Sequence, residues 1–260
     1  MSCEKIKLYY FNYVTDDLST LTPSSEDTNF PVSNLKTPLR TKVFRSTSSS
    51  CNIVIDTATT EQISDLLVLP SSIDNQFGFT GDLTIEANAT NSWSSPAFST
   101  TLTPNRENNF GIATFDTAQS YRFWRVSASS GASYAELADV FLGKAFTPGK
   151  NVDFNWTYSE KDISKITSNR YGQKYIDKIT TLKEESLSIK FLTKDELEDF
   201  YSFANFVGKN KPFYIVLDNG ESFSPNREFF AGKFYLRSDI TYTNVAYNYY
   251  NLNMRVEECT

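Results

Sequence analysis

The stretches Tyr121-Arg-Phe-Trp-Arg-Val126 and Tyr134-Ala-Glu-Leu-Ala-Asp-Val-Phe-Leu-Gly143 decide the fold of this chain. The first is rich in aromatic residues, and the second is an apolar run that ends in a glycine. Residues 127–133 lie between them and are rich in Ser and Gly, which is typical of a turn. This order predicts two strands that pair with each other.

Side chains along the first stretch are expected to alternate between a core and water. Phe123 and Val126 are expected to face the core, whereas Arg122 and Arg125 are expected to face the solvent.

Further short strands are predicted upstream. They cover residues 53–56, 66–69 and 83–87, and the last of these shows a clear apolar alternation. Residues 92–104 are expected to form a loop, and residues 15–50 an irregular lead-in rich in Ser, Thr, Pro and Asn. Short strands separated by frequent turn signals predict a β-sandwich.

The first half of the chain closely resembles the discoidin-like, galactose-binding jelly roll. Phe44-Arg45-Ser46, Asn52-Ile-Val-Ile-Asp56 and the two stretches quoted above carry the resemblance. In the family an aromatic-Arg-Ser segment is followed by an apolar-x-apolar-Asp segment, and an aromatic-Arg-aromatic strand precedes a final strand ending in Leu-Gly. The resemblance implies a binding or docking module rather than a catalyst. It also implies that ligands sit in the loops at one end of the sandwich.

Arginines in this half could bind a carboxylate or a phosphate. The resemblance instead favours a structural role, in which Arg45, Arg122 and Arg125 pair with acidic residues such as Asp56 or Glu136.

The character of the sequence changes at Pro148-Gly149, a dipeptide that breaks regular elements. We expect residues 145–150 to form a linker. The predicted domains are therefore a discoidin-like β-sandwich over residues 1–145 and a second domain over residues 146–260.

One helix is predicted among the strands of the second half. Thr193-Lys-Asp-Glu196 forms a capping box, apolar residues at helical spacing continue to about Val207, and Gly208 suits a C-terminal cap. A tight turn is predicted at residues 218–220. Strands are predicted at residues 152–156, after the turn within 170–178, and at residues 185–191, 212–217, 229–236 and 249–256. The expected fold class is mainly β, with a sandwich followed by a β-barrel or sandwich that carries one packed α-helix.

The order of elements in the second half resembles the barrel domain of bacteriophage minor tail and distal tail proteins. The resemblance covers roughly residues 150–258 and is carried by the Tyr171-Gly172 turn, the strand Leu187-Ser-Ile-Lys-Phe191, the capped helix, and the segments 208–213, 229–234 and 252–257. It implies a ring around the tail axis, a hexamer or else a trimer, in contact with other tail tube and tip proteins. It also implies a virion protein that is assembled in the host cytoplasm, with the jelly roll as a peripheral domain.

The composition argues against several other functions. A formal net charge of −6 gives no general attraction for nucleic acid. No apolar run is long enough to insert into a membrane, and the N-terminus lacks a signal-peptide pattern. The chain has no histidine, which removes most nucleophile–base pairs, and its three widely spaced cysteines are expected to be reduced thiols.

Four residues are candidates for a ligand site. Trp93 and Phe77 could offer an aromatic platform to the apolar face of a sugar, and Asn75 and Arg106 could supply hydrogen bonds. The alternative is that these aromatic residues close the end of the sandwich or meet a neighbouring subunit.

Tyrosines near the C-terminus are candidates for subunit contacts, because tyrosine is enriched at interfaces. They are Tyr242, Tyr247, Tyr249 and Tyr250. No cofactor is expected. A structural calcium ion could use the loop carboxylates, although no calcium-loop motif is present. Those carboxylates are Asp74, Asp82, Glu136 and Asp139.

Adjacent carboxylates at 184–185, 195–196 and 198–199 could act as a glycosidase pair, but acidic residues at a helix start more simply stabilise its dipole. An enzyme is therefore not expected. The leading hypothesis is a structural protein of a bacteriophage tail, at the tail tip or baseplate, whose jelly roll docks neighbours or touches host cell-surface glycans. The alternative is a stand-alone carbohydrate-binding module.

Overall fold

A computed structural model describes residues 5–153, 157–177, 179, 181–217 and 230–259. The chain divides into two compact units: residues 8–146 make up nearly all of the first, and residues 5–7, 147–217 and 233–259 build the second. The predicted turn at 218–220 lies outside the described residues, as does the end of the strand predicted at 152–156. No helix in the described ranges is long and apolar enough to cross a membrane.

The first unit is built from antiparallel strands and one short 3-10 helix. Its elements are β2 (Thr20–Pro23), η1 (Val32–Lys36), β3 (Phe44–Arg45), β4 (Ser50–Leu69), β5 (Thr80–Asn88), β6 (Phe98–Leu102), β7 (Gly111–Ser129), β8 (Glu136–Leu137) and β9 (Asp139–Gly143). The main sheet has the order β2-β4-β7-β5-β6, and β9 pairs with β4 outside this path.

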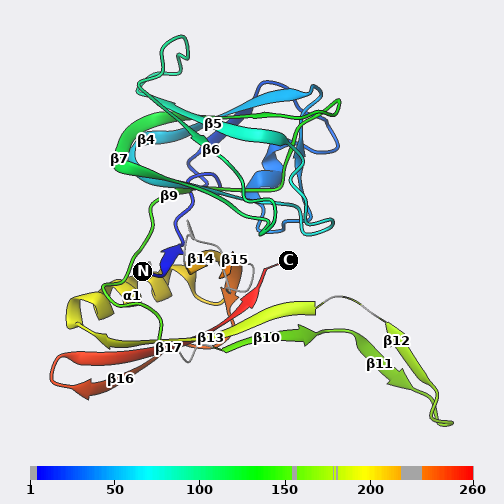
Figure 1. Cartoon of the computed structure of the whole chain (residues 1–260), viewed down its shortest axis with the longest axis vertical. Helices are drawn as coiled ribbons and strands as arrows, with labels where there is room; N and C mark the ends of the chain where they lie inside the picture. Colours follow the sequence, from blue (N-terminus) through cyan, green and yellow to red (C-terminus); the bar gives the residue numbers. More distant parts are fainter. Residues whose placement is uncertain (1–4, 154–156, 178, 180, 218–229, 260) are drawn as a thin grey trace. The chain divides into compact units, whose positions relative to one another are not determined.

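Two long strands, β4 and β7, hold the sandwich together. Ser50 pairs with Ser129 at one end of β4, and Val68 pairs with Gly111 at the other. Figure 1 shows β7 curling around one side of the sandwich with β4 alongside it. The register shifts between Asp56 and Glu61, where Ala58 adopts a left-handed backbone with φ of 63°. This bulge bends the strand without ending its ladder, so the separate strands predicted at 53–56 and 66–69 are one strand.

Trp124 is at the centre of the core and is fully buried. The prediction that Phe123 and Val126 both face the core was wrong. Residues two apart in a strand share a face, so Trp124 and Val126 point inward together. Phe123 is half-buried on the opposite face, next to Arg125. Trp124 stacks on Phe115 with ring centroids 5.8 Å apart and an interplanar angle of 9°.

The two stretches that open the sequence argument both form strands, but these strands do not pair with each other. β9 instead pairs with β4, where Phe141 lies opposite Leu67. The predicted loop at 92–104 also contains a strand, β6, which pairs with β5. Its Leu102 is buried and its Phe98 packs against Phe115, so alternating apolar contacts favour a strand there.

The arginine pairings expected in this unit are present. Arg45 reaches Glu136 through Nη2 at 2.7 Å, and Arg122 holds both carboxylate oxygens of Asp56. The Arg122 guanidinium lowers the pKa of the Asp56 carboxyl, mainly through these hydrogen bonds.

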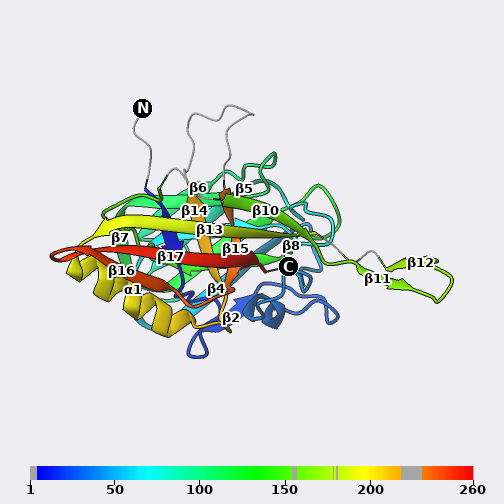
Figure 2. The ribbon, with the colours of Figure 1, turned by 90° about the horizontal axis from the view of Figure 1, so that it is seen from below.

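The second unit is a seven-stranded sheet with one helix and a separate hairpin. Its elements are β10 (Thr157–Asp162), β11 (Lys165–Ser168), β12 (Lys174–Asp177), β13 (Thr181–Leu192), α1 (Lys194–Val207), β14 (Phe213–Leu217), β15 (Phe230–Leu236), β16 (Thr241–Ala246) and β17 (Tyr249–Glu258). The sheet order is β14-β15-β17-β13-β10, with β1 (Lys7–Tyr9) beyond β14 and β16 also paired with β17. Figure 2 shows β16, β17, β13 and β10 side by side.

Helix α1 begins and ends as predicted. Thr193 and Glu196 form a reciprocal capping box, and Gly208 follows the helix with φ of 52°. Its apolar stripe faces the sheet, with Phe203 in edge contact with Phe213 of β14 at 5.0 Å. The predicted fold class, mainly β with a sandwich first and one packed helix in the second part, is confirmed.

We expect Arg45→Lys to destabilise the first unit by about 1–3 kcal/mol. The Arg45 guanidinium donates two hydrogen bonds to Glu136 and lies 4.1 Å from the Phe30 ring and 4.2 Å from the Tyr134 ring. A lysine would keep the charge but lose the second hydrogen bond and the planar stacking. Urea denaturation measures the change in free energy of unfolding.

The matched control is Arg122→Lys, because that ion pair is more exposed and should contribute less. An Arg45→Lys protein as stable as the unmodified chain would contradict the structural role of Arg45.

Candidate functional site

Three of the four predicted ligand-site residues meet at one end of the sandwich. The guanidinium carbon of Arg106 lies 5.6 Å from the centre of the Phe77 ring and 5.4 Å from that of Phe79, and Arg106 Nη2 donates to the carbonyl oxygen of Gly81 at 3.2 Å. Phe79 is buried and packs against the half-buried Phe77 at 5.2 Å. These rings close the end of the sandwich, as the structural alternative proposed.

Asn75 is held in this cluster by Asn109, which sequence reasoning missed. With its amide oriented to satisfy both atoms, Asn109 accepts from Asn75 Nδ2 at 2.7 Å and donates to the Asn75 carbonyl oxygen at 2.8 Å. Both residues have left-handed backbones, with φ of 54° and 55°. Asparagine tolerates this conformation better than most residues with a side chain. The two asparagines are therefore the one sequence signal that could have pointed to this pair of hydrogen bonds, the Asn75–Asn109 clasp.

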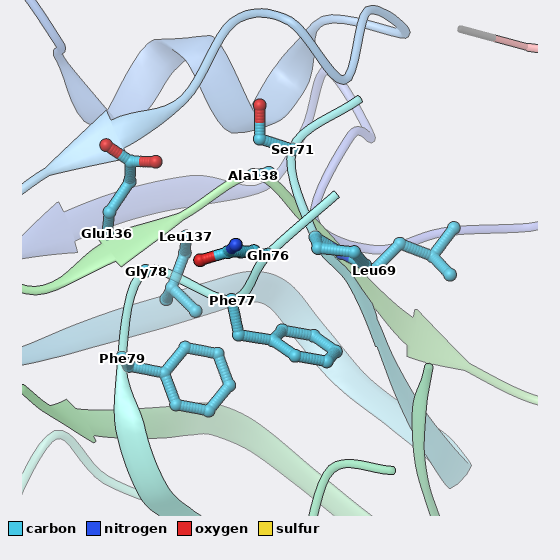
Figure 3. A pocket seen from close by; sticks show the side chains of 10 residues that line it. Leu69, Ser71, Gln76, Phe77, Gly78, Phe79, Glu136, Leu137 and Ala138 are labelled. Atoms are coloured by element: carbon cyan, nitrogen blue, oxygen red, sulfur yellow. The ribbon is translucent and has the colours of Figure 1, made fainter. Parts of the chain in front are cut away.

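A narrow crevice lies beside this cluster. Its lining includes Gln76, Phe77, Gly78, Phe79, Glu136 and Leu137. Figure 3 shows the Phe77 and Phe79 rings next to each other and the Glu136 carboxylate pointing away from them. A Cβ atom at Gly78 would lie only 2.4 Å from Glu136 Cβ, so the loop can pass this close only with glycine. The crevice is too narrow to admit a water molecule, and it therefore offers no preformed sugar pocket.

Trp93, the fourth predicted residue, belongs to a different surface. Its ring lies under the Arg125 guanidinium at 4.7 Å, and its Nε1 donates to Asn91 Oδ1 at 2.7 Å. Arg125 Nε in turn donates to Glu86 of β5 at 2.6 Å. Glu86 and Gly81 are separated by five positions along one strand, roughly 16 Å, so Trp93 and Arg106 do not form one site.

The predicted interface tyrosines line a hairpin of the second unit and differ widely in exposure. Tyr247 is 90% exposed at the turn between β16 and β17, Tyr249 is 44% exposed, and Tyr250 is half-buried. Tyr242 packs its ring on Tyr201 at 4.7 Å. Tyr247 and Tyr249 are thus available for contact, whereas much of Tyr242 is already covered.

Two of the carboxylates weighed as catalysts are engaged in structural contacts. Glu196 caps α1, and Glu184 pairs with Lys161 at 3.0 Å and also with Arg237. Among the described residues, no three Cys, Asp or Glu side chains gather closely enough to hold a metal ion. The calcium candidate Glu136 is paired with Arg45. Burial raises the pKa of the Cys51 thiol, which keeps it in its unreactive neutral form.

The sequence matches no known protein family and no curated protein. Among solved structures it is similar to a family 32 carbohydrate-binding module from Clostridium perfringens in complex with galactose, with a TM-score of 0.42 and 14% identity, over 52% of this chain and 98% of the module. It is also similar to a fucose-binding module from Streptococcus pneumoniae, with a TM-score of 0.41 and 16% identity, over 52% of this chain and 98% of that one. A chitosan-binding module from Paenibacillus gives a TM-score of 0.39 and 18% identity, over 52% and 100% of the two chains. These findings do not bear on the bacteriophage-tail expectation, which stays a prediction.

We expect Tyr242→Phe to remove a loss of stability at high pH. Burial, with a smaller contribution from Tyr201, raises the pKa of the Tyr242 hydroxyl from 10.0 to about 12. Because the pKa is higher in the folded state, ionisation of Tyr242 favours the unfolded chain, so the stability is unaffected by this group below pH 10 and falls as the pH rises to about 12. Urea denaturation should show that the free energy of unfolding of the variant, relative to that of the unmodified chain, is higher at pH 11 than at pH 8.

At pH 8 the variant should be at least as stable, because the buried Tyr242 hydroxyl has no hydrogen-bond partner among the described residues. Tyr247→Phe, at an exposed position, is the control and should change stability at neither pH. If the unmodified chain and Tyr242→Phe differ in free energy of unfolding by the same amount at both pH values, the raised pKa of Tyr242 is refuted.

Proposed function

We propose that the first unit is a non-catalytic carbohydrate-binding module whose contact residue is Trp93. The observation that supports this is the half-buried indole on a polar loop, with Arg125 over it and Asn91 fixing its ring nitrogen. A pyranose presents one apolar face that can stack on such a ring, while its hydroxyl groups need nearby donors and acceptors.

Polar groups surround this ring. The Arg125–Glu86 pair lies beside it, and the loop carries exposed hydroxyls at Ser92, Ser94 and Ser95. Glu86 can accept hydrogen bonds from sugar hydroxyls, and the serines can both donate and accept. The rigid strands β5 and β7 hold Glu86 and Arg125, so the polar groups are positioned before a ligand arrives.

We expect the unmodified chain to bind at least one sugar on a glycan array, and Trp93→Ala to weaken that binding at least about tenfold, equivalent to about 1.4 kcal/mol. Affinity would be measured by titration calorimetry with the strongest ligand of the array. Phe77→Leu is the matched control, because Phe77 closes the sandwich end and should leave affinity unchanged. An array without any bound sugar, or a loss only in Phe77→Leu, would overturn the proposal.

A second function, self-assembly, is favoured by the β11–β12 hairpin. Its opposed residues Ile166 and Ile176 are 64% and 65% exposed, and Tyr171 and Tyr175 are also exposed. A two-stranded hairpin whose apolar side chains are this exposed is marginal in water. We propose that a second copy of the chain covers it.

Charge complementarity supports a copy of this chain as the occupant. The hairpin carries Lys165, Arg170 and Lys174, whereas the first turns of α1 carry Asp195, Glu198 and Asp199 on exposed positions. Figures 1 and 2 show the hairpin projecting beyond one end of the second unit's sheet, whereas α1 packs on the sheet toward its other end. A hairpin of one copy on the α1 surface of the next is a head-to-tail contact, which closes into a ring when the rotation permits. Such a ring is what a tail-tip or baseplate protein of a bacteriophage virion, assembled in the host cytoplasm with tube and tip partners, would require.

We expect the unmodified chain to form a closed oligomer and the double variant Ile166→Ser/Ile176→Ser to be monomeric, because the variant loses the apolar contact. Native mass spectrometry and light scattering would measure the mass. Ile73→Ser, at an equally exposed position of the first unit, should leave the oligomer intact. A chain that stays monomeric at the highest soluble concentration would refute self-assembly through this hairpin.

A further inference from the structure

A polar groove lies on the second unit's sheet and includes the strand pair β13–β17. It has a volume of about 570 Å³, within the range of small-ligand sites. Thr157 of β10, Ser186 and Ser188 of β13, and Asn253 and Arg255 of β17 line it, together with residues of the turn before β16. Arg255 lies opposite Ser186, and Asn253 opposite Ser188.

The alternation of the strands explains why this surface is polar. Leu187 and Met254 are buried toward the core, so their neighbours along each strand point to the other face. The strand order therefore brings hydroxyl and amide side chains from β10, β13 and β17 together on one open surface.

Arg255 differs from the other cations around the groove. Arg237 pairs with Glu184 and Glu257, Lys161 pairs with Glu184, and Lys209 pairs with Asp239 on the groove wall at 2.8 Å. Arg255 has no ion pair and no side-chain hydrogen bond within the part of the chain that the structure describes. Its guanidinium is exposed and can offer a planar fork of donors to an anion.

The hydroxyl groups of the groove are equally unengaged. The side chains of Thr157, Ser186, Ser188 and Asn253 make no hydrogen bond to any residue in the described ranges. One uncompensated arginine beside several free hydroxyl and amide groups suits a ligand that carries both a carboxylate and hydroxyl groups.

We propose that this groove binds an acidic saccharide, with Arg255 holding its carboxylate and the groove's hydroxyl and amide groups binding its hydroxyls. The site lies wholly within the second unit and is independent of Trp93. The two sugar-binding proposals can therefore succeed or fail separately.

The test is titration calorimetry of the full chain with glucuronic acid and N-acetylneuraminic acid, at low and at physiological salt. We expect binding that weakens with salt and that falls at least about tenfold in Arg255→Gln. Lys42→Gln removes one exposed positive charge from the first unit and should leave binding unchanged, as should Trp93→Ala.

Two further ligands separate the parts of the proposal. The methyl ester of glucuronic acid lacks the negative charge, and equal binding of this ester would overturn the role of Arg255. Acetate lacks the hydroxyl groups, and acetate that competes as well as the sugar would reduce the groove to a simple anion site. If Arg255→Gln proves unstable, Ser188→Gln is the alternative variant, because its larger side chain fills the groove from the neighbouring strand. Unchanged binding by Ser188→Gln would refute this groove as the binding site. No binding of either acidic sugar at millimolar concentration overturns the proposal outright.

Discussion

The pairing of β4 with β7 is the constraint on which the first unit depends. The two strands remain hydrogen-bonded to each other on both sides of a shared bend, so both layers of the sandwich belong to one ladder. Ala58 makes the bend with a backbone conformation that usually favours glycine, and Asp56 accepts a hydrogen bond from its amide. Trp124 fills the space between the layers. The sheet order, the aromatic core and the positions of the loops all follow from this bent ladder.

Features encoded locally could be predicted from the sequence. The capping box fixed the start of α1, Gly208 fixed its end, and the arginine partners in the first unit followed from the resemblance to a jelly roll. Features that depend on long-range pairing could not. No residue pattern near Ala58 indicates that the ladder continues past it. The segment predicted as a loop at 92–104 contains strand β6, which forms because it pairs with β5. Trp124 was assigned to the wrong face because Phe123 and Val126, which are three positions apart, were placed on the same side, whereas side chains in a strand alternate every two residues.

The candidate sites show the same division. Sequence placed Trp93 and Arg106 in one loop site because both lie in polar segments, whereas the length of β5 separates them. The Asn75–Asn109 hydrogen bonds join two loops that are far apart in the sequence, and no local pattern reveals that pairing. The groove around Arg255 was invisible for another reason: its members come from β10, β13 and β17, and only the order of strands in the folded sheet makes them neighbours.

The bent ladder of β4 and β7 also determines how this protein must fold. Both ends of β4 pair with residues that are synthesised much later: Ser50 with Ser129, and Leu67 with both Ile112 and Phe141. Folds dominated by such distant contacts have high contact order and fold slowly. During synthesis the apolar half of β4 therefore has both edges open, a state prone to association between nascent chains. The architecture that makes the finished sandwich continuous thus leaves an apolar strand edge uncovered while the chain is still growing.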